Sequence, residues 1–319
     1  MQSVVLAAMS EDYPRTMLDL ERRFNTEDAC RKYLFALRWP QGWSCPRCGS
    51  SRAGAIRRNL WQCHKCRFEA SVITGTIFQD SHLPMTTWFR AIWQVTCNKN
   101  GISALGLMRA LGLGSYKTAW AILHKLRRAM VRPGRDRLAG VVEVDETYWG
   151  AEEDGVIGRL TEDKAIVIVA AQEDGGGVGR VRMRCIPDVT RASLHGFIAE
   201  SVEPGSTVRT DGLKAYLGLK DYAHDRKVQG DPKKSDHLMP KVHLVVSLLK
   251  RWLLGTHQGA IGLEHLDYYL DEFTFRFNRR KSASRGKLFY RLIQQAVQVE
   301  PAPFSTLIKP QSMGHCGVK

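Results

Sequence analysis

Three carboxylates gather in one short apolar stretch of this sequence, VVEVDETYWG at residues 141–150. Val142 and Val144 alternate with Glu143 and Asp145, a period of two that is typical of a β-strand with valines on one face and carboxylates on the other. Two explanations fit the pattern. The carboxylates can form the solvated face of a half-buried strand, or they can hold divalent cations, since Mg²⁺ prefers oxygen ligands.

The elements around this stretch indicate what it faces. The expected order is three meandering strands, a crossover helix and a fourth strand, at residues 141–149, 164–172, 178–186, 190–201 and 206–212. EDGGG joins the second and third strands as a hairpin turn; it lacks the Lys-Ser/Thr of a phosphate-binding loop. This order is that of the ribonuclease H-like α/β fold, in which the fourth strand lies parallel beside the first.

In that arrangement Asp145 of the first strand and Asp211 at the end of the fourth face each other across the sheet. Two carboxylates so close repel each other unless cations lie between them. A pair of Mg²⁺ ions about 3.5–4 Å apart relieves this repulsion and also catalyses phosphoryl transfer. We therefore expect Asp145 and Asp211 to bind Mg²⁺, or Mn²⁺ in its place.

A second metal site is predicted upstream, in WSCPRCGSSRAGAIRRNLWQCHKC. Two Cys-x2-Cys pairs, separated by fourteen residues, offer the four thiolates of a closed tetrahedral site, which is typical of a zinc ribbon. Such a site leaves no position for a substrate, so the zinc is structural. The expected ligands are Cys45, Cys48, Cys63 and Cys66.

Residues 85–130 read as three helices. The last two, joined by a turn that contains Gly112, match a helix-turn-helix pattern in which Ser115 caps the final helix. We expect DNA contacts from the ribbon, from this final helix and from the basic segment FNRRKSASRGK (277–287). The residues proposed for them are Arg57, Arg58, Lys117, Lys125, Arg127, Arg128, Arg279 and Arg280.

The distribution of charge supports a polyanionic partner. Of the net charge of +15, residues 41–140 contribute +13, with 16 basic and 3 acidic side chains. A local basic block favours nucleic acid. No apolar run approaches the roughly 20 residues of a membrane span, and the first residues do not read as a secretory signal. The four cysteines outside the ribbon are scattered, which is typical of a reducing compartment such as the cytoplasm.

Shifts in composition place the expected domain boundaries. The sequence predicts an N-terminal helical segment, a zinc ribbon, a helix-turn-helix-like segment, a linker rich in Pro and Gly, a catalytic domain and a C-terminal tail. In the same order these cover residues 1–40, 41–80, 81–132, 133–140, 141–300 and 301–319.

Four elements resemble a known family when they are taken in order. They are CPRCGS…WQCHKC, VEVDETYWGA, TDGLKAY and LLKRWLLGTHQGAI…HLDYYLDEFTFRFNRR. Over residues 15–300 the chain is similar to insertion-sequence transposases of the DDE superfamily, in the zinc-ribbon group related to Merlin elements. The resemblance implies that Asp145 and Asp211 are the first two catalytic ligands. It also implies a homodimer or higher multimer, in the bacterial nucleoid, that cuts transposon ends and joins their 3′ hydroxyls to target DNA.

One position departs from the family pattern. The third ligand in such relatives is usually an Asn or an acid just before a Lys-x-Trp that matches Lys250 and Trp252. Leu248 occupies this position here, and leucine cannot bind a metal.

Three explanations remain open for the third ligand. His243 or Ser247 can serve instead if the correspondence is shifted. A carboxylate of the segment EHLDYYLDEF, Glu264 or Glu272, can supply it from further along the chain. Alternatively, the site can work with two protein acids and water, because Mg²⁺ normally keeps several waters.

The departure also leaves two other functions open. The first is a zinc-ribbon DNA-binding regulator derived from a transposase, and the second is a metal-dependent nuclease that cuts DNA without joining it.

Overall fold

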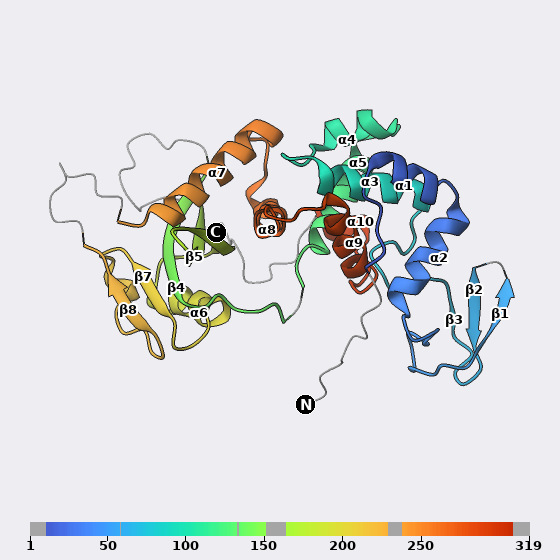
Figure 1. Cartoon of the computed structure of the whole chain (residues 1–319), viewed down its shortest axis with the longest axis horizontal. Coiled ribbons are helices and arrows are strands. Elements are labelled where there is room, and N and C mark those ends of the chain that lie inside the picture. Colours follow the sequence, from blue (N-terminus) through green and yellow to red (C-terminus); the bar gives the residue numbers. More distant parts are fainter. Residues whose placement is uncertain (1–10, 58, 133, 151–163, 229–237, 309–319) are drawn as a thin grey trace. The chain divides into compact units, whose positions relative to one another are not determined.

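The computed structural model describes residues 11–57, 59–132, 134–150, 164–228 and 238–308. The chain divides into two compact units (Figure 1). Unit 1 combines Met1–Arg132 with Lys281–Leu307, and unit 2 combines Pro133–Arg280 with Ile308–Lys319. Within the described residues, no helix is both long and apolar enough to cross a membrane.

Unit 1 is a small helical body with a three-stranded sheet. The antiparallel sheet has the order β1-β2-β3 and carries the paired cysteines at its ends. Its strands are β1 (Ala53–Arg57), β2 (Leu60–Cys63) and β3 (Glu69–Ala70). The helices are α1 (Met17–Arg23), α2 (Glu27–Arg38), α3 (Met85–Cys97), α4 (Ala104–Leu111), α5 (Tyr116–Arg128) and α9 (Arg285–Ala296), and α10 (Phe304–Ile308) begins in this unit.

The expected helix-turn-helix elements form as predicted. Ser103 caps α4 by accepting the N–H of Gly106 at 3.1 Å, and Gly112 ends it with φ 61°, in the left-handed region that glycine adopts without strain. Ser115 is the N-cap residue of α5. Gly112 and Ser115 therefore allowed both helices and the turn between them to be predicted from the sequence.

The sequence placed the end of the catalytic domain at residue 300, whereas α9 belongs to unit 1 in the structure. The side chain of Phe289 is fully buried there, with its ring centroid 5.7 Å from that of Phe89 and 5.8 Å from that of Trp93 on α3. The chain thus returns after Arg280 to complete the core of its N-terminal half. Leu307, expected in a loosely held tail, is buried as well.

Unit 2 contains a five-stranded mixed sheet with the order β6-β5-β4-β7-β8. The strands β4, β5 and β6 form an antiparallel meander, while β7 pairs parallel with β4 and β8 with β7. This is the arrangement expected of the ribonuclease H-like fold, with β8 as an addition that the sequence did not predict. The strands are β4 (Val141–Trp149), β5 (Ala165–Asp174), β6 (Gly177–Ile186), β7 (Thr207–Thr210) and β8 (Ala223–Arg226).

Helices cover both faces of this sheet (Figure 1). Val142 and Val144 of β4 share one apolar core with α6 (Arg191–Ser201) and the short helix η1 (Lys214–Tyr216). The other core lies between the opposite face and two helices that follow the strands. These are α7 (Pro240–His257) and α8 (Leu266–Phe277), with the short helix η2 (Leu263–His265) between them. The carboxylates that alternate with the valines of β4 therefore point toward α7.

The segment expected to be a linker, residues 133–140, is described from residue 134 onward, and this described part docks on the sheet. Leu138 is fully buried and bridges to Val202. Arg182 donates to the carbonyl of Asp136 at 2.5 Å, and Arg180 donates to the carbonyl of Arg137 at 2.9 Å. Arginines of β6 thus hold the segment in place, so it is part of unit 2.

Candidate active site

The pairing of β4 with β7 brings two acidic positions together. The parallel register sets Glu143 opposite Arg209, so two residues further along the same face are Asp145 and Asp211. The strand β7 ends at Thr210, which leaves Asp211 at its carboxyl end. Asp145, Glu146 and Asp211 each offer a carboxylate oxygen within 4.8 Å of the others. The two aspartates therefore face each other, as the fold predicted.

The environment of Asp145 makes its negative charge unfavourable in the metal-free protein. Its side chain is only 18% exposed. Burial raises the pKa of Asp145 above its usual range, and the nearby charge of Asp211 raises it further; the N–H of Glu146 and the ring of His243 oppose these effects. Asp211 accepts the N–H of Leu213 at 2.9 Å, which fixes one of its oxygens. A divalent cation would relieve the crowded charge, so the donor set fits a metal.

Glu146 joins this cluster from the other face of β4. Its Oε2 accepts a hydrogen bond of 2.8 Å from the hydroxyl of Tyr216, which is fully buried in the core beside α6. Tyr216 belongs to the segment TDGLKAY, one of the four elements that carry the family resemblance. In the structure it orients a carboxylate of the cluster.

Helix α7 places His243 at the site. Its Nε2 lies 3.3 Å from Asp145 Oδ2. Leu248, further along the same helix, packs against the apolar core between α7 and the sheet. His243 was one of the side chains considered for the third ligand, and it is the one that contacts Asp145.

The carboxylates proposed from the segment EHLDYYLDEF lie elsewhere. Glu272 is 1% exposed, within α8. Glu264 lies 3.7 Å from His265 in an ion pair. Neither belongs to the acidic cluster found among the described residues. The geometry therefore gives no support to this one of the three alternatives for the third ligand.

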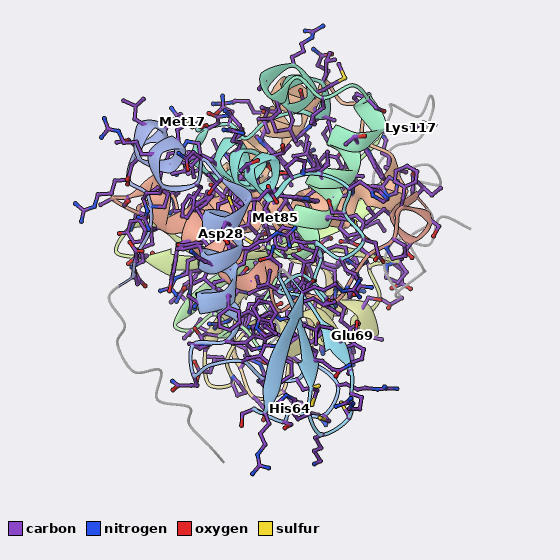
Figure 2. All side chains as sticks on the ribbon, turned by 90° about the vertical axis from the view of Figure 1, so that its right-hand side faces the viewer. Met17, Asp28, His64, Glu69, Met85 and Lys117 are labelled. Carbon is purple, nitrogen blue, oxygen red and sulfur yellow. The ribbon has the colours of Figure 1, made fainter. Side chains whose placement is uncertain are left out.

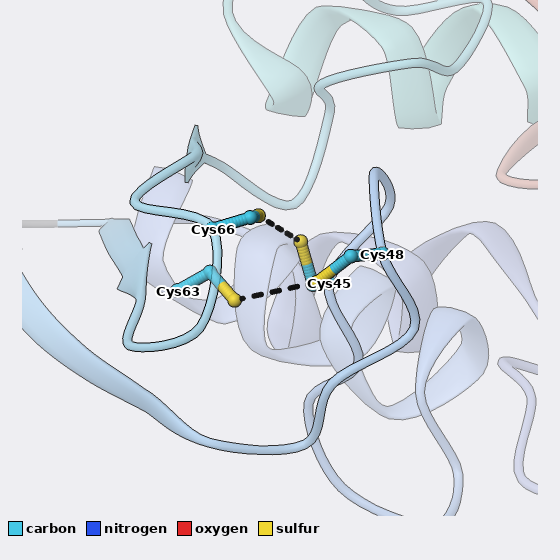
Figure 3. A group of neighbouring side chains, drawn as sticks. All are labelled: Cys45, Cys48, Cys63 and Cys66. Atoms are coloured by element: carbon cyan, nitrogen blue, oxygen red, sulfur yellow. Dashed lines mark hydrogen bonds between the residues drawn. The ribbon is translucent and has the colours of Figure 1, made fainter.

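The four cysteines of the ribbon converge as predicted (Figure 3). The Sγ atoms of Cys45 and Cys66 lie 3.6 Å apart, as do those of Cys48 and Cys63. A tetrahedral zinc with Zn–S bonds of about 2.3 Å requires sulfurs about 3.8 Å apart, whereas a disulfide requires about 2.05 Å. The backbone N–H of Cys66 and that of Lys65 lower the pKa of Cys63 to about 6, which favours the thiolate that binds metal.

The proposed DNA-contacting residues of unit 1 divide into two groups. Arg57 in the ribbon and Lys117 in the first turn of α5 are exposed (Figure 2, where Lys117 is labelled). Arg58 lies outside the described residues. Of the basic residues in the second half of α5, Arg127 is buried in the core, whereas Lys125 and Arg128 are partly exposed.

The three cations in this half of α5 are buried to different degrees. Arg127 is 1% exposed and lies 3.2 Å from His124. Lys125 is half-buried, and burial lowers its pKa. Arg128 is also partly buried.

Arg279 and Arg280 are bound by unit 2 itself. Arg280 donates to the carbonyls of Val178, Gly179 and Phe277, and so ties the end of α8 to the start of β6. Arg279 donates to the carbonyl of Phe275 at 3.1 Å and stacks on its ring at 4.0 Å. These contacts are structural, so the expectation that both arginines face DNA is not supported by their geometry.

Comparisons with known proteins agree with this arrangement. Residues 137–278 match the family model described as the ISXO2-like transposase domain, and residues 25–69 match that of the transposase zinc-ribbon domain. The chain carries both domains of a zinc-ribbon insertion-sequence transposase. It is also 28% identical over 282 residues to an uncharacterized protein in transposable element ISH50 of Halobacterium salinarum, a match that covers 80% of this chain and 92% of that protein.

Sequence reasoning passed over two contributors to the site of this transposase. Glu146 follows Asp145 directly, and strict alternation assigned it to the opposite face of the strand. It reaches the cluster because β7 pairs with β4 only as far as Glu143, so the edge beside Glu146 is open. The role of Tyr216 depends on the same contact. Neither the spacing nor the composition of the sequence indicates that Glu146 and Tyr216 belong to the site.

Proposed function

We propose that this transposase binds the ends of its mobile element, cuts them, and joins the 3′ hydroxyls to target DNA by metal-dependent phosphoryl transfer. The observation that carries the proposal is the cluster of Asp145, Glu146 and Asp211 at the carboxyl end of a parallel strand pair. Ligands bind at such strand ends in open α/β sheets.

Asp145 and Asp211 would hold Mg²⁺ or Mn²⁺, with Glu146 beside them. A bound pair of such ions would supply Lewis-acid stabilisation of the charge that develops on phosphate oxygens. The protein holds the carboxylates in place, because the N–H of Leu213 binds Asp211 and the hydroxyl of Tyr216 binds Glu146. The half-buried setting of Asp145 limits the competition of water for its oxygens.

His243 would act as the third ligand. Its ring nitrogen lies within 3.3 Å of Asp145, and it comes from the helix that follows the core strands. An imidazole in this position favours transition metals over Mg²⁺ more than a carboxylate does, because Mg²⁺ is a hard ion that prefers oxygen.

The ribbon and the first turn of α5 would dock the DNA. The ribbon would be held by one structural zinc per chain, so chelation should unfold this module. Its exposed cations can contact phosphates without reading sequence. A helix-turn-helix reads base edges with the first turn of its second helix, which is where Lys117 is exposed. The exposed cations of the ribbon are Arg47, Arg52, Arg57, Lys65 and Arg67. Because an element has two ends, we expect at least two copies of the chain on DNA.

The test is cleavage and joining of labelled element-end DNA by the purified full chain with Mg²⁺ or Mn²⁺. Asp145→Asn and Asp211→Asn should abolish both reactions and leave DNA binding intact. Asp221→Asn is the matched control, because Asp221 is an exposed aspartate with φ 66°, a conformation that asparagine also tolerates. Full activity of either site variant would refute the assignment. Binding without cleavage would indicate a DNA-binding regulator, and cleavage without joining a nuclease.

A further inference from the structure

Glu143, the first carboxylate of the acidic strand, lies outside the cluster and is fully buried. A buried carboxylate is costly unless hydrogen bonds and an opposite charge compensate it. Its Oε2 accepts two backbone N–H groups, from Lys241 at 2.8 Å and from Val242 at 2.9 Å. Its Oε1 lies 3.7 Å from a guanidinium nitrogen of Arg209, its register partner on β7. Oε2 is therefore hydrogen-bonded, whereas the buried Oε1 has the ion pair with Arg209 but no hydrogen bond within the described part of the chain.

These two N–H groups are the ones that the start of α7 leaves without a partner in the helix. The first N–H groups of a helix have no carbonyl to bind. Pro240 opens α7 and has no N–H, and the preceding Met239 has no side-chain oxygen with which to cap the helix. Glu143 of the distant strand β4 therefore serves as the cap. Its negative charge also opposes the positive end of the helix dipole.

The cap lies directly beside the contact between His243 and Asp145. His243 follows Val242 in the first turn of α7, and Asp145 lies two residues from Glu143 on the same face of β4. Strand β4 therefore contacts the first turn of α7 at two successive positions. Glu143 accepts the backbone N–H groups, and Asp145 contacts the imidazole of His243. Any shift of the first turn would move His243 away from the carboxylate that it meets.

We propose that Glu143 is a positioning residue that fixes the first turn of α7, and thereby His243, against the metal-binding aspartates. The inference rests on the proposed role of His243. Arg209 extends the same control to β7, the strand that leads into Asp211, because it lies on that strand and pairs with Glu143. One buried carboxylate therefore aligns the three elements that supply the site.

Glu143→Gln is the informative variant, because it preserves the volume of the side chain. The single amide oxygen can accept from α7, but the amide NH₂ then faces the Arg209 guanidinium, and the charge at the helix end is lost. Asp225→Asn is the matched control. It also removes a carboxylate from Arg209, yet Asp225 makes its ion pairs with Arg209 and Lys227 rather than with α7.

The first readout is independent of activity. Amide hydrogen exchange of Lys241 and Val242, measured by NMR on the full zinc-loaded chain, should accelerate about tenfold or more in Glu143→Gln, since a neutral acceptor replaces the charged one and weakens both hydrogen bonds. The same amides should exchange at the wild-type rate in Asp225→Asn. Unchanged exchange in Glu143→Gln would overturn the inference, even if the wild-type chain proved unable to cleave DNA.

The second readout separates positioning from a general loss of structure. In Mn²⁺-dependent cleavage, Glu143→Gln should raise the half-saturating metal concentration by about tenfold or more, the range that loss of an outer-shell partner costs. The maximal rate should recover at saturating Mn²⁺. A lower maximal rate at an unchanged metal requirement would indicate a smaller folded fraction and would contradict the positioning role. Absence of cleavage by the wild-type chain would refute the proposed function and leave the exchange result to decide.

Discussion

The hydroxyl of Tyr216 donates a hydrogen bond of 2.8 Å to Glu146 Oε2, and so links the two segments that carry the clustered aspartates. Asp145 precedes Glu146 directly, and Asp211 lies five residues before Tyr216. Burial raises the pKa of Tyr216, which keeps the phenol protonated and able to donate. The contact therefore holds one carboxylate of the cluster in a fixed orientation.

We expect Tyr216→Phe to weaken metal binding while the fold is retained. The ring keeps its packing, but Glu146 loses a donor, and the free energy of unfolding should fall by about 1 kcal/mol. Tyr222→Phe is the control, because Tyr222 donates to the carbonyl of Val202, away from the carboxylates. Isothermal titration with Mn²⁺ makes the comparison. Equal affinities in the two variants would show that the hydroxyl of Tyr216 does not serve the site.

Removing the charge of Asp145 should stabilise the metal-free protein. Its pKa is raised in the folded state, so the ionised form is penalised there, and the free energy of unfolding falls as the pH rises above the usual pKa of an aspartate. Asp145→Asn should therefore melt at a higher temperature than wild type at pH 7, and the difference should vanish below about pH 3.5.

Divalent metal should reverse this order. Mg²⁺ at a hundred times its dissociation constant adds about 2.7 kcal/mol to the wild-type free energy of unfolding through binding, and it should add much less to Asp145→Asn. Differential scanning calorimetry with and without Mg²⁺ measures both effects. A variant that is less stable than wild type in metal-free buffer at pH 7 would contradict the described electrostatics.

Substitution of His243 should change the preference for metal. His243→Glu replaces an imidazole with a carboxylate, which suits Mg²⁺ better than it suits Co²⁺. The ratio of Co²⁺-supported to Mg²⁺-supported cleavage should therefore fall in this variant. Ser247→Ala, one turn further along α7, is the control and should keep the wild-type ratio. An unchanged ratio in His243→Glu would exclude direct ligation by this residue.

Much of the fold followed from local patterns in the sequence. The alternating valines of β4 and the order of the next four elements indicated the mixed sheet, since chain connectivity leaves few alternatives for a meander followed by a crossover. Gly112 ends α4 and Ser115 precedes α5, where the sequence placed the end of one helix and the start of the next. The spacing of the four cysteines was sufficient to predict the zinc ribbon.

What the sequence did not reveal depends on tertiary packing. The strand β8 is short and polar, and it exists because β7 offers it an edge. The amphipathic character of α9 indicates a buried face but not the partner, so its return to unit 1 was not predictable. Likewise, Glu143 and Asp145 are both carboxylates on the same face of β4, so the sequence does not distinguish their roles. Only the position of α7 separates the capping carboxylate from the one in the cluster.

The cations of α5 and those that follow α8 illustrate the same limit, and they lead to a prediction about DNA binding. The logarithm of the DNA-binding constant falls linearly with the logarithm of the salt concentration, and the slope reflects the number of phosphate contacts. Lys117→Ala should make this slope shallower by about one unit, because an exposed lysine displaces a counterion from a phosphate. Arg280→Ala should leave this slope unchanged and lower the free energy of unfolding by about 2 kcal/mol through lost carbonyl contacts. Fluorescence anisotropy over a salt series, with parallel denaturation, measures both. The opposite pattern would restore Arg280 as a DNA contact.

The most direct measurement is anomalous diffraction from crystals of the full chain soaked in Mn²⁺. We predict an anomalous peak within bonding distance of carboxylate oxygens from both Asp145 and Asp211, with the His243 ring turned toward it. Manganese bound elsewhere, or full occupancy at this place in crystals of Asp211→Asn, would contradict the claim that the two aspartates share a divalent ion.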